Sequence, residues 1–382
     1  MKAYKFKLRT NRKFTENAQK TLNVCRELYN ASIEERRNAH KYNLSITAKP
    51  HLSKIKVSYK TQANQLPEIK ELRDDLKHTY SQVLQDVLKR SEKAFDGFFR
   101  RCKTNQKAGY PRFKGKGRYN SFTYPQSGFK LEGDKLYLSK IGSVRVRLSR
   151  IVEGWIKTCT IRRESDGWYV IFTVEPNQSK YIPKTRQNVG IDVGLETFAT
   201  MSDGSTIANP RFFRESEEEL AKAQQKLSTK RKGSGKRQAA KKVVSKIHRK
   251  IRNQRIDFAY KEVNNLLKKY DAIGLEKLNV KGLLKSNLAK SISDVAWSTF
   301  TSILVCKAGD AGRKVVFVNP KYTSTDCSCC GHRKKLTLAD RIYNCEKCGL
   351  SINRDLNAAK NIQVRAEPRL IPESPPITRS RV

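Results

Sequence analysis

The first residues of the chain alternate between apolar and basic side chains. Tyr4, Phe6 and Leu8 fall on one face of an extended segment, and the residues between them are lysines. A period of two is typical of a β-strand with one buried face. We therefore predict a strand over roughly 2–9. The segment lacks the continuous apolar run of an export signal, so we do not expect it to be one.

A helical period appears further along the chain. Apolar side chains recur at spacings of three and four, which is typical of a long amphipathic helix with one face in the core. These side chains are Val83, Leu84, Val87, Leu88, Ala94, Phe95, Phe98 and Phe99. The other faces carry several Lys and Arg residues, which either contact nucleic acid or are simply solvated.

Alternation then returns in the segment before residue 175. Asp166-Gly167 provides a hairpin turn between two strand-like stretches. We predict that the opening strand, a helical insertion over about 12–128 and these later strands form an N-terminal domain over 1–187. Its predicted architecture is a β-barrel interrupted by helices, and residues 176–187 form the linker that leaves it.

The pattern beyond residue 187 predicts a second domain, so the chain is expected to be a multidomain α+β protein. The strands expected are 188–193, 196–201, a third after the turn at 202–204, a short one ending near Glu276, and 315–318. The helices expected are a polar hairpin over 211–270 divided near Gly233, a helix over 294–312, and a last helix from Asp355 to about 364. Residues 281–294 are predicted to be a mobile loop, and the proline-containing tail over 367–382 is predicted to be disordered.

The positive charge of the chain favours an anionic partner. Lys and Arg number 79 against 36 Asp and Glu, which gives a formal net charge of +43. Thirteen Lys or Arg and no acid lie between Lys226 and Ile256. This excess predicts extensive contact with nucleic acid, although a ribosomal-type or membrane-surface protein is also basic. No segment approaches the ~20 apolar residues of a membrane span, so we expect no membrane partner.

A basic loop with interleaved aromatic residues is predicted over 101–126. Aromatic rings can stack on bases while Lys and Arg hold phosphates, although a plain flexible loop is the alternative. The candidate nucleic-acid contacts are Tyr110, Arg112, Phe113 and Lys114, and the aromatic pattern continues to Phe122 and Tyr124.

Three carboxylates lie on separate segments of the second domain. Asp192 follows an apolar strand, Glu276 ends another, and Asp355 opens the last helix. An RNase H-like fold has this order of elements: three antiparallel strands, a helix, a further strand and then helices. In such a fold the three acids can converge at one edge of the sheet. We therefore predict a catalytic site at which they bind two Mg²⁺ ions that bridge a scissile phosphate. Any one of them alone could instead cap a turn or helix or pair with a neighbouring lysine.

A four-cysteine cluster lies between the second and third carboxylates. Cys327 and Cys330 form one pair, Cys345 and Cys348 form another, and 14 residues separate the pairs. This spacing is typical of a zinc ribbon, and a glycine follows each pair where the knuckle turns. We predict one structural Zn²⁺ with four thiolate ligands, and Cys329 is not expected to be among them.

Together these residues resemble the TnpB family, which comprises insertion-sequence-encoded RNA-guided endonucleases with a split RuvC domain and is related to type V CRISPR effectors. The likeness covers about residues 1–365. Its most specific motifs are Gly190–Gly194, Gly274–Glu276, Gly109–Lys114, Thr323–Cys327 with the three other cysteines, and Asn353–Asn361.

The resemblance implies an RNA-guided DNA endonuclease of a transposable element. A guide RNA from the element's own end would pair with double-stranded target DNA beside a short adjacent motif. The N-terminal domain, with a wedge-like barrel, would recognise the guide RNA and that motif. A single RuvC-like site, formed by 188–322 and by 351–366 with the zinc ribbon 323–350 inserted, would cut both strands. It further implies a cytoplasmic prokaryotic protein that works as a monomer with its RNA.

The resemblance also implies two sets of nucleic-acid contacts. Tyr80, Ser81, Gln82 and Gln85, at the start of the long helix, would face bases. Arg354 would contact a phosphate or the metal shell. Two other functions remain open at this point: a nuclease-inactive RNA-guided repressor, and a transposase that acts on DNA directly.

Overall fold

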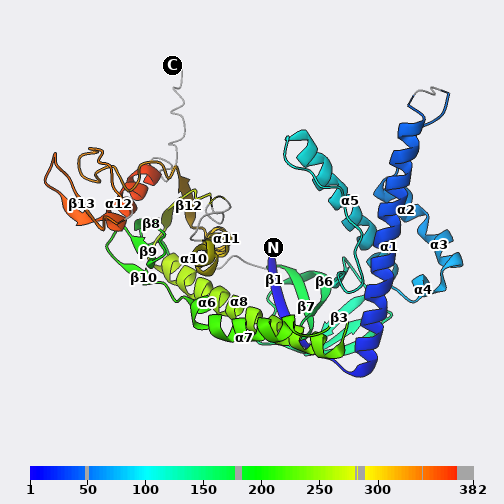
Figure 1. Ribbon diagram of the computed structural model, residues 1–382. Helices are drawn as coiled ribbons and strands as arrows, with labels where there is room; N and C mark the ends of the chain where they lie inside the picture. Colours follow the sequence, from blue (N-terminus) through cyan, green and yellow to red (C-terminus); the bar gives the residue numbers. More distant parts are fainter. Residues whose placement is uncertain (48–50, 177–182, 280–281, 283–288, 338, 368–382) are drawn as a thin grey trace, which may run out of the picture. The chain divides into compact units, whose positions relative to one another are not determined.

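The computed structural model describes residues 1–47, 51–176, 183–279, 282, 289–337 and 339–367 (Figure 1). The chain divides into two compact units, Met1–Gln178 and Ser179–Val382. None of the described helices is both long and apolar enough to cross a membrane. Residues 177–182 of the predicted linker, 281 and 283–288 of the predicted loop, and 368–382 of the predicted tail lie outside the described residues.

The first unit is built on a seven-stranded antiparallel sheet with the order β2-β6-β7-β1-β5-β4-β3. Its strands are β1 (Lys2–Arg9), β2 (Ser121–Tyr124), β3 (Phe129–Glu132), β4 (Lys135–Leu138), β5 (Gly142–Arg147), β6 (Trp155–Glu164) and β7 (Gly167–Glu175). β1 lies between β5 and β7, and its Tyr4, Phe6 and Leu8 are buried as predicted. The strand order has two ends, so the described backbone pairing does not itself close a barrel.

Helices fill the interval between β1 and β2. They are α1 (Arg12–Ser45), α2 (Tyr59–Asn64), α3 (Leu66–Leu72), α4 (Asp74–Lys77) and α5 (Ser81–Lys103). α5 is the amphipathic helix predicted from its period, and its buried stripe includes Val83, Leu84 and Phe95. Phe99 departs from that prediction, because it is 55% exposed. Ser32 of α1 and Ser91 of α5 share a buried hydrogen bond of 2.5 Å that joins the two long helices.

The predicted basic loop over 101–126 is shorter than the sequence suggested. α5 continues to Lys103, and β2 pairs with β6 from Ser121 onward. Phe122 and Tyr124 are therefore core residues of β2, 0% and 1% exposed, and cannot stack on bases. The prediction was wrong there because a two-residue alternation of aromatic residues is also the pattern of a short buried strand.

The second unit contains a five-stranded mixed sheet with the order β10-β9-β8-β11-β12. The strands are β8 (Asn188–Asp192), β9 (Thr197–Met201), β10 (Thr206–Ala208), β11 (Ala272–Glu276) and β12 (Lys314–Val318). β8, β9 and β10 are antiparallel neighbours, whereas β11 runs parallel to both β8 and β12. All five predicted strands are present.

The last helix, α12 (Arg354–Ala366), lies directly on this sheet. Two glycines permit the approach: a Cβ at Gly190 would lie 2.1 Å from the Ala359 carbonyl oxygen, and one at Gly274 would lie 2.9 Å from the Ala366 Cβ. Because the strand backbone at these two glycines lies directly against α12, the start of the helix is fixed relative to the ends of β8 and β11.

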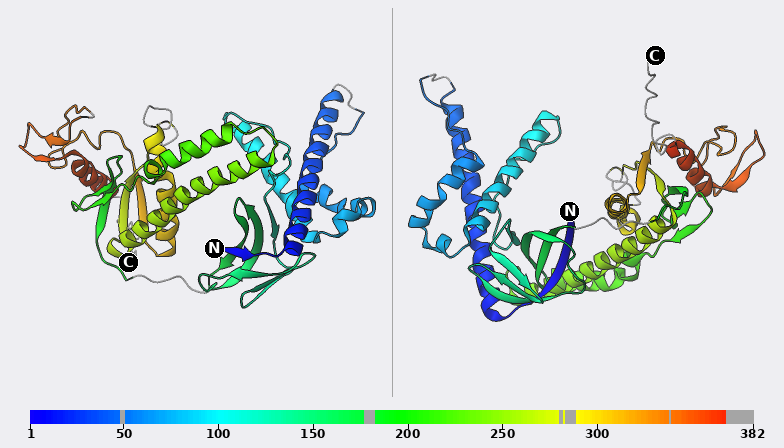
Figure 2. Two further views of the ribbon diagram at one scale, coloured as in Figure 1. Left: turned by 60° about the horizontal axis from the view of Figure 1, so that its bottom comes forward. Right: turned by 180° about the vertical axis from the view of Figure 1, so that it is seen from behind.

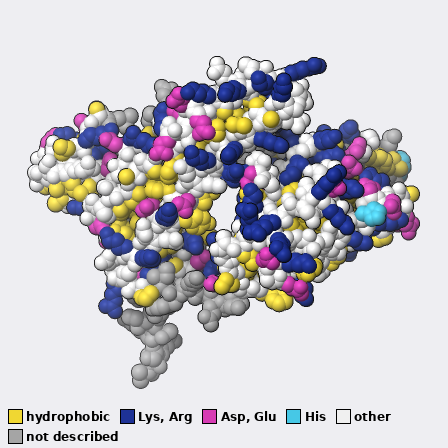
Figure 3. All heavy atoms as spheres, turned by 90° about the horizontal axis from the view of Figure 1, so that it is seen from below, with side chains coloured by type: hydrophobic (Ala, Val, Ile, Leu, Met, Phe, Trp, Pro, Cys, Tyr) yellow, Lys and Arg dark blue, Asp and Glu magenta, His cyan; other side chains and the backbone are white. Residues whose placement is uncertain are grey.

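A polar helical hairpin follows β10, as predicted. It comprises α6 (Phe212–Glu215), α7 (Glu217–Ser228) and α8 (Gly235–Lys269), and the Ser234 Oγ caps α8 by accepting the Arg237 N–H at 3.1 Å. α7 and α8 lie side by side in both views of Figure 2 and share a small apolar core that includes Leu220 and Ile251. Lys and Arg side chains are widespread on the face drawn in Figure 3.

The segment predicted as a mobile loop over 281–294 ends in a helix instead. α10 (Ala289–Val295) precedes α11 (Trp297–Asp310), and the two are separated at Ala296, whose φ is 56°. α11 buries Trp297, Phe300, Leu304 and Ala308, the apolar residues expected there.

The boundary between the units falls earlier than the predicted boundary at residue 187. Asp271 accepts the backbone N–H groups of Thr185 and Arg186 at 2.9 and 2.7 Å. Arg313 pairs with Asp271 and donates to the Pro183 carbonyl at 2.6 Å. Residues 183–187 are therefore anchored to the second unit by polar contacts that the sequence pattern does not reveal.

Candidate functional site

Asp192 and Glu276 leave the sheet side by side. β8 and β11 are parallel neighbours, and Ile191 lies opposite Leu275. Asp192 and Glu276 are the next residues of the two strands, so both carboxylates emerge at the same edge. Apolar residues hold the strand ends in the core, and the two acids are only partly buried.

Asp355 reaches this region from the first turn of α12. It does not cap the helix, because the Asn353 side chain accepts the N–H groups of Asp355 and Leu356 at 2.9 and 3.2 Å. The Asp355 carboxylate is thus available for another role. Asp192 and Asp355 line the same open cleft of about 1150 Å³.

The charges of the other two acids influence the pKa of Asp192. Burial raises the pKa of Asp192 well above its usual range, and the negative charges of Glu276 and Asp355 raise it further. Burial also raises the pKa of Glu276, while a hydrogen bond from Thr323 opposes this. Concentrated negative charge of this kind is what a bound divalent cation would neutralise.

The carboxylates are not gathered as tightly as the cysteine thiols. Within the described ranges, Cys327, Cys330, Cys345 and Cys348 form the group of potential ligands whose atoms all lie within 4.8 Å of one another. Two metal ions about 3.5–4 Å apart do not require such compactness, since different carboxylates can bind different ions.

The four thiols fit a zinc ion by their geometry. Cys327 and Cys348 sulfurs lie 3.7 Å apart, and Cys330 and Cys345 sulfurs lie 3.5 Å apart. Thiolates about 2.3 Å from a tetrahedral zinc lie about 3.8 Å from one another. Backbone N–H groups of Cys348 and Lys347 lower the pKa of Cys345, whereas burial and the neighbouring thiols raise the pKa values of Cys330 and Cys348, so the geometry of the thiols rather than their ionisation carries the fit to zinc.

The knuckles and hairpin of the ribbon hold these thiols in place. Gly331 and Gly349 both have φ of 73°, a left-handed conformation that follows each cysteine pair as predicted. Two short strands pair antiparallel in the ribbon. β13 (Ile342–Asn344) lies between the two glycines, and β14 (Ser351–Asn353) follows Gly349. Cys329 is exposed and lies outside the thiol group, so the four positions are those expected from the sequence.

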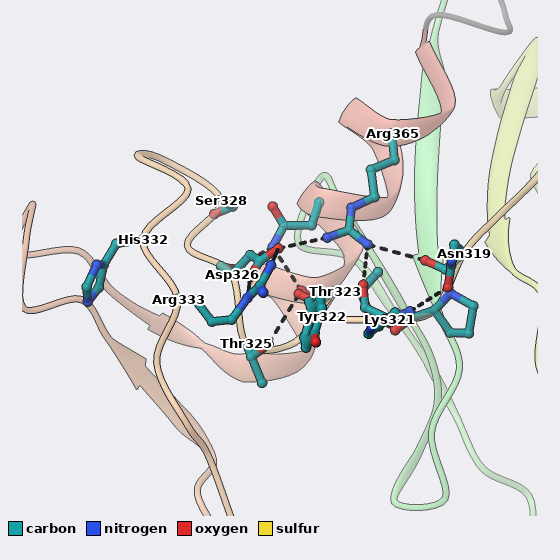
Figure 4. A network of polar contacts seen from close by, with 12 residues as sticks. Asn319, Lys321, Tyr322, Thr323, Thr325, Asp326, Ser328, His332, Arg333 and Arg365 are labelled. Atoms are coloured by element: carbon teal, nitrogen blue, oxygen red, sulfur yellow. Dashed lines mark hydrogen bonds and ion pairs between the residues drawn. The ribbon is translucent and has the colours of Figure 1, made fainter.

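A polar network joins the start of the ribbon to α12 (Figure 4). Asn357 donates to the Asp326 carbonyl at 2.8 Å and accepts the Ser328 N–H at 2.8 Å. Asn361 donates to the carbonyls of Thr323 and Asp326 at 2.9 and 2.7 Å. Arg365 bonds to the Lys321 carbonyl at 2.7 Å and to the Asp326 carboxylate at 3.0 Å.

The network ends on one of the three acids. The Thr323 hydroxyl donates to the Glu276 carboxylate, and Thr323 is 1% exposed. Thr323, Asn357 and Asn361 lie in motifs that the sequence analysis singled out, but their contacts with Glu276 and with the loop were not predicted, and Arg365 was not singled out. The available signal was the spacing of four between polar residues 357, 361 and 365, which places them on one face of the helix.

The predicted base-facing residues at the start of α5 also make contacts within the protein. The Tyr80 hydroxyl lies 2.8 Å from the Ser127 Oγ, and its ring stacks on Tyr124. Ser81 accepts from Lys70 at 2.7 Å, and Gln82 accepts the Ser127 N–H at 3.3 Å. Gln85 is partly buried. The structure therefore gives Tyr80 and Gln82 a role in holding the turn before β3, and base contact stays a prediction.

The predicted contacts in the basic loop differ in exposure. Tyr110 packs edge-on against Phe95, and the Arg37 guanidinium lies over the rings of Tyr110 and Phe113. Phe113 is 46% exposed and Arg112 is exposed. The Lys114 backbone exchanges two hydrogen bonds with the Asn30 side chain. The loop is thus anchored to α1, with Arg112 and Phe113 on its surface.

Arg354 lies in the cleft beside the acids. Its guanidinium is 3.5 Å from the Asp355 carboxylate and donates to the Thr337 carbonyl at 3.2 Å. Its charge lowers the pKa of Asp192, opposing the neighbouring acids. The cleft is also lined by Arg211, Arg214 and Arg341, which the sequence did not single out.

Two family models match the second half of the chain. The IS605 OrfB model, described as "Probable transposase", matches residues 171–287, and the model of the Cas12f1-like TNB domain matches residues 297–362. The first match contains Asp192 and Glu276, and the second contains the four cysteines and Asp355.

Individual relatives and a solved structure extend over nearly the whole chain. A protein of Escherichia coli (strain K12), InsQ, named as a candidate RNA-guided DNA endonuclease, is 31% identical and covers 95% of this chain and 91% of its own. A similarly named protein of Streptomyces pristinaespiralis is 32% identical over 94% of this chain and 88% of its own. The structure titled as a Cas12f1-sgRNA-target DNA complex matches 92% of this chain and 83% of its own, with a TM-score of 0.59 and 17% identity, and so shares the fold. The chain therefore belongs to the TnpB family of insertion-sequence proteins, as its motifs predicted.

Proposed function

We propose that this TnpB-family protein is an RNA-guided DNA endonuclease of a transposable element. The observation that carries the proposal is that three distant segments place acids together: Asp192 and Asp355 line one cleft, and Glu276 ends the strand beside that of Asp192. The relatives that cover most of the chain bear the endonuclease name. The net charge of +43 suits a protein that holds both a guide RNA and its DNA target.

The order of strands in the second unit supports the proposal of an RNase H-like, RuvC-type domain. Three antiparallel strands are followed by two parallel ones, and the order β10-β9-β8-β11-β12 places the first strand in the centre. Asp192 lies on that central strand and Glu276 on its parallel neighbour. α12 brings the third acid to the same edge.

Asp192, Glu276 and Asp355 would hold two Mg²⁺ ions. When bound, these ions would activate a water and stabilise the leaving oxygen of the phosphodiester. Asp192 lies within the influence of both other acids, whose negative charges raise its pKa. Thr323 restricts the Glu276 carboxylate by hydrogen bonding to one of its oxygens. Arg354 supplies a positive charge at the cleft wall that a DNA phosphate can approach.

The four cysteine thiolates would hold one structural Zn²⁺. All four positions of a tetrahedral ion are then filled by protein, which leaves no position for a substrate. The ion would therefore fix the ribbon and, through Asp326, Asn357 and Asn361, the loop that contains Thr323. It would not take part in hydrolysis.

The first unit would recognise the guide RNA and the motif beside the target. The two end strands of its sheet are linked by side chains, which would suit a barrel-like unit: the Tyr124 ring of β2 contacts Phe129 of β3, and the Tyr124 hydroxyl donates to the Ser139 carbonyl at 2.8 Å. The exposed Arg112 and Phe113 are the residues of the basic loop best placed for nucleic acid.

Alanine variants of the three acids test the assignment. We expect Asp192→Ala, Glu276→Ala and Asp355→Ala each to abolish target cleavage while the protein still co-purifies with its RNA. Asp257→Ala is the matched control, because Asp257 lies on α8 and its side chain is 65% exposed in a pair with Lys261. Substantial cleavage by any of the three acid variants would contradict the site.

RNA co-purification separates this function from the alternatives. Protein that binds guide RNA and target yet never cuts would be a nuclease-inactive repressor, which the complete set of acids argues against. Protein that cuts or joins DNA without RNA would be a transposase acting directly on DNA.

A further inference from the structure

The arginines of the nuclease cleft differ in what their side chains contact. Arg214 pairs with Glu217 at 3.2 Å, Arg341 with Glu196 at 3.0 Å, and Arg354 with Asp355 at 3.5 Å. Arg211 lines the same cleft, and within the described part of the chain its guanidinium has no recorded partner. Its side chain is exposed. A guanidinium that lines the proposed DNA cleft and has no partner among the described residues is suited to bind a phosphate.

The backbone at Arg211 is left-handed, with φ of 48° and ψ of 39°. This conformation is unfavourable for a residue with a Cβ, and it persists only where surrounding contacts fix it. It occurs directly before α6, so it sets the direction in which the Arg211 side chain leaves the chain.

Contacts on both sides fix this conformation. Asn209 accepts the Arg211 N–H at 3.2 Å and donates to the Leu195 carbonyl at 2.7 Å. Asp294 accepts the Phe213 N–H at 2.9 Å. Asp294 itself is 7% exposed and bound to Arg255 at 2.7 Å, so this anchor is built into the core.

Asn209 also ties Arg211 to the metal-binding segment. Leu195 lies three residues after Asp192, in the turn that leads from β8 to β9. One amide side chain therefore bonds both the turn that follows Asp192 and the backbone of Arg211. Asp192, Asn209, Arg211 and Asp294 all line the cleft.

Left-handed geometry alone would not indicate function. Arg186 has a φ of 59° and is also exposed, yet it lies outside the residues that line the cleft. What distinguishes Arg211 is its place in the cleft together with the anchors that hold it there.

We propose that Arg211 binds a backbone phosphate of the DNA strand in the cleft, flanking the phosphate that is cut. The inference rests on the proposed nuclease function and adds a substrate contact to the same site. The contact holds the strand against the acids, whereas overall target affinity comes from pairing with the guide. Loss of Arg211 should therefore slow cleavage and leave target binding unchanged.

The test compares Arg211→Gly, Arg211→Asn and Arg211→Lys with Arg186→Gly, each as the assembled protein–RNA complex. Gly and Asn both tolerate a left-handed backbone, so neither should lower the melting temperature. We expect single-turnover cleavage of a matched target to slow about tenfold or more in Arg211→Gly and Arg211→Asn. Arg211→Lys should retain most of the rate, and Arg186→Gly should match the wild type. The slowing should shrink as salt is raised, because salt screens the lost interaction in the wild type.

A second measurement locates the phosphate. Single methylphosphonates, which are uncharged, are placed at successive positions around the cut in the target strand. One position should slow the wild type and add no further slowing to Arg211→Gly. Equal effects of every methylphosphonate on both proteins, or wild-type cleavage rates in Arg211→Gly, would overturn the Arg211 contact while leaving the nuclease intact. Absence of cleavage by the wild-type complex would instead overturn both proposals.

Discussion

At the scale of single residues, the proposed site depends on side chains that hold the acids as well as on the acids themselves. Glu276 is oriented by a buried hydroxyl, and Asp355 is freed from helix capping by Asn353. The three acids could be found from the sequence because each sits in a short motif. Thr323 lies in such a motif too, but its hydrogen bond to Glu276, like the place of Arg211 in the cleft, depends on what folding brings together.

Thr323→Val should impair cleavage without unfolding the protein. Valine keeps the shape of threonine but cannot donate to Glu276, and a hydrogen bond to a charged group is worth about 1.5–3 kcal/mol. We expect the cleavage rate to fall about tenfold or more and the Mg²⁺ concentration for half-maximal rate to rise. Thr323→Ser keeps the hydroxyl and should restore both values. A Thr323→Val protein with an unchanged Mg²⁺ requirement would show that Thr323 does not position Glu276. Binding of Mn²⁺, followed by calorimetry, gives a readout independent of cleavage.

At the scale of elements, α12 is the part on which the site converges. It packs on β8 and β11 through glycines, supplies Asp355, and bonds the loop that leads into the zinc ribbon. The order and type of strands could be predicted from apolar periodicity, because short buried segments bounded by turns are strongly marked. The helix α10 was missed because its seven residues, Ala289–Val295, show little period. The strand β2 was missed because its aromatic residues looked like a base-stacking loop.

Gly190→Ala should displace α12 from the sheet. The added methyl group would lie 2.1 Å from the Ala359 carbonyl oxygen and 2.4 Å from the Gln363 nitrogen, so backbone must move. We expect a loss of about 2–3 kcal/mol in the free energy of unfolding, together with loss of cleavage. Gly235→Ala is the control, since a Cβ there meets nothing within 4 Å at the start of α8. Equal stability of the two variants in urea titrations would argue against close packing at Gly190.

Cys345→Ser should release zinc and loosen the ribbon. A structural zinc of this type contributes roughly 10–16 kcal/mol of local binding free energy, so removing one thiolate should greatly lower metal content. Cys329→Ser should keep a full zinc ion, because Cys329 lies between the ligands but outside the thiol group. Metal analysis by mass spectrometry and thermal unfolding measure the two effects. Full zinc occupancy in Cys345→Ser would contradict the four-thiolate assignment.

At the scale of the whole molecule, the charge and the family could be predicted from the sequence. The anchoring of residues 183–187 to the second unit could not. The excess of basic residues and the spacing of the motifs predicted a nucleic-acid enzyme of the TnpB family. The position at which one unit ends and the next begins depends on Asp271 and Arg313, which fix residues 183–187 by tertiary contacts.

The charge of the chain predicts a strong dependence of nucleic-acid binding on salt. Each phosphate neutralised by Lys or Arg releases counterions, with a slope of log affinity on log salt of about −0.7 to −0.9 per contact. We expect the affinity of the protein for its guide RNA to fall about a thousandfold or more between 50 and 200 mM salt. Filter binding across this range measures the slope, and a slope near zero would exclude a large electrostatic interface.

The most direct test of the central claim is guided cleavage of a plasmid. Protein co-expressed with the flanking end of its element would be mixed with a plasmid bearing a guide-matched target beside a randomised motif, with Mg²⁺ or with a chelator. We predict double-strand breaks that require the matched target and Mg²⁺, that are absent with Asp192→Ala, and that reveal the adjacent motif. Bound RNA without breaks at any motif, or breaks that ignore the guide, would contradict an RNA-guided nuclease.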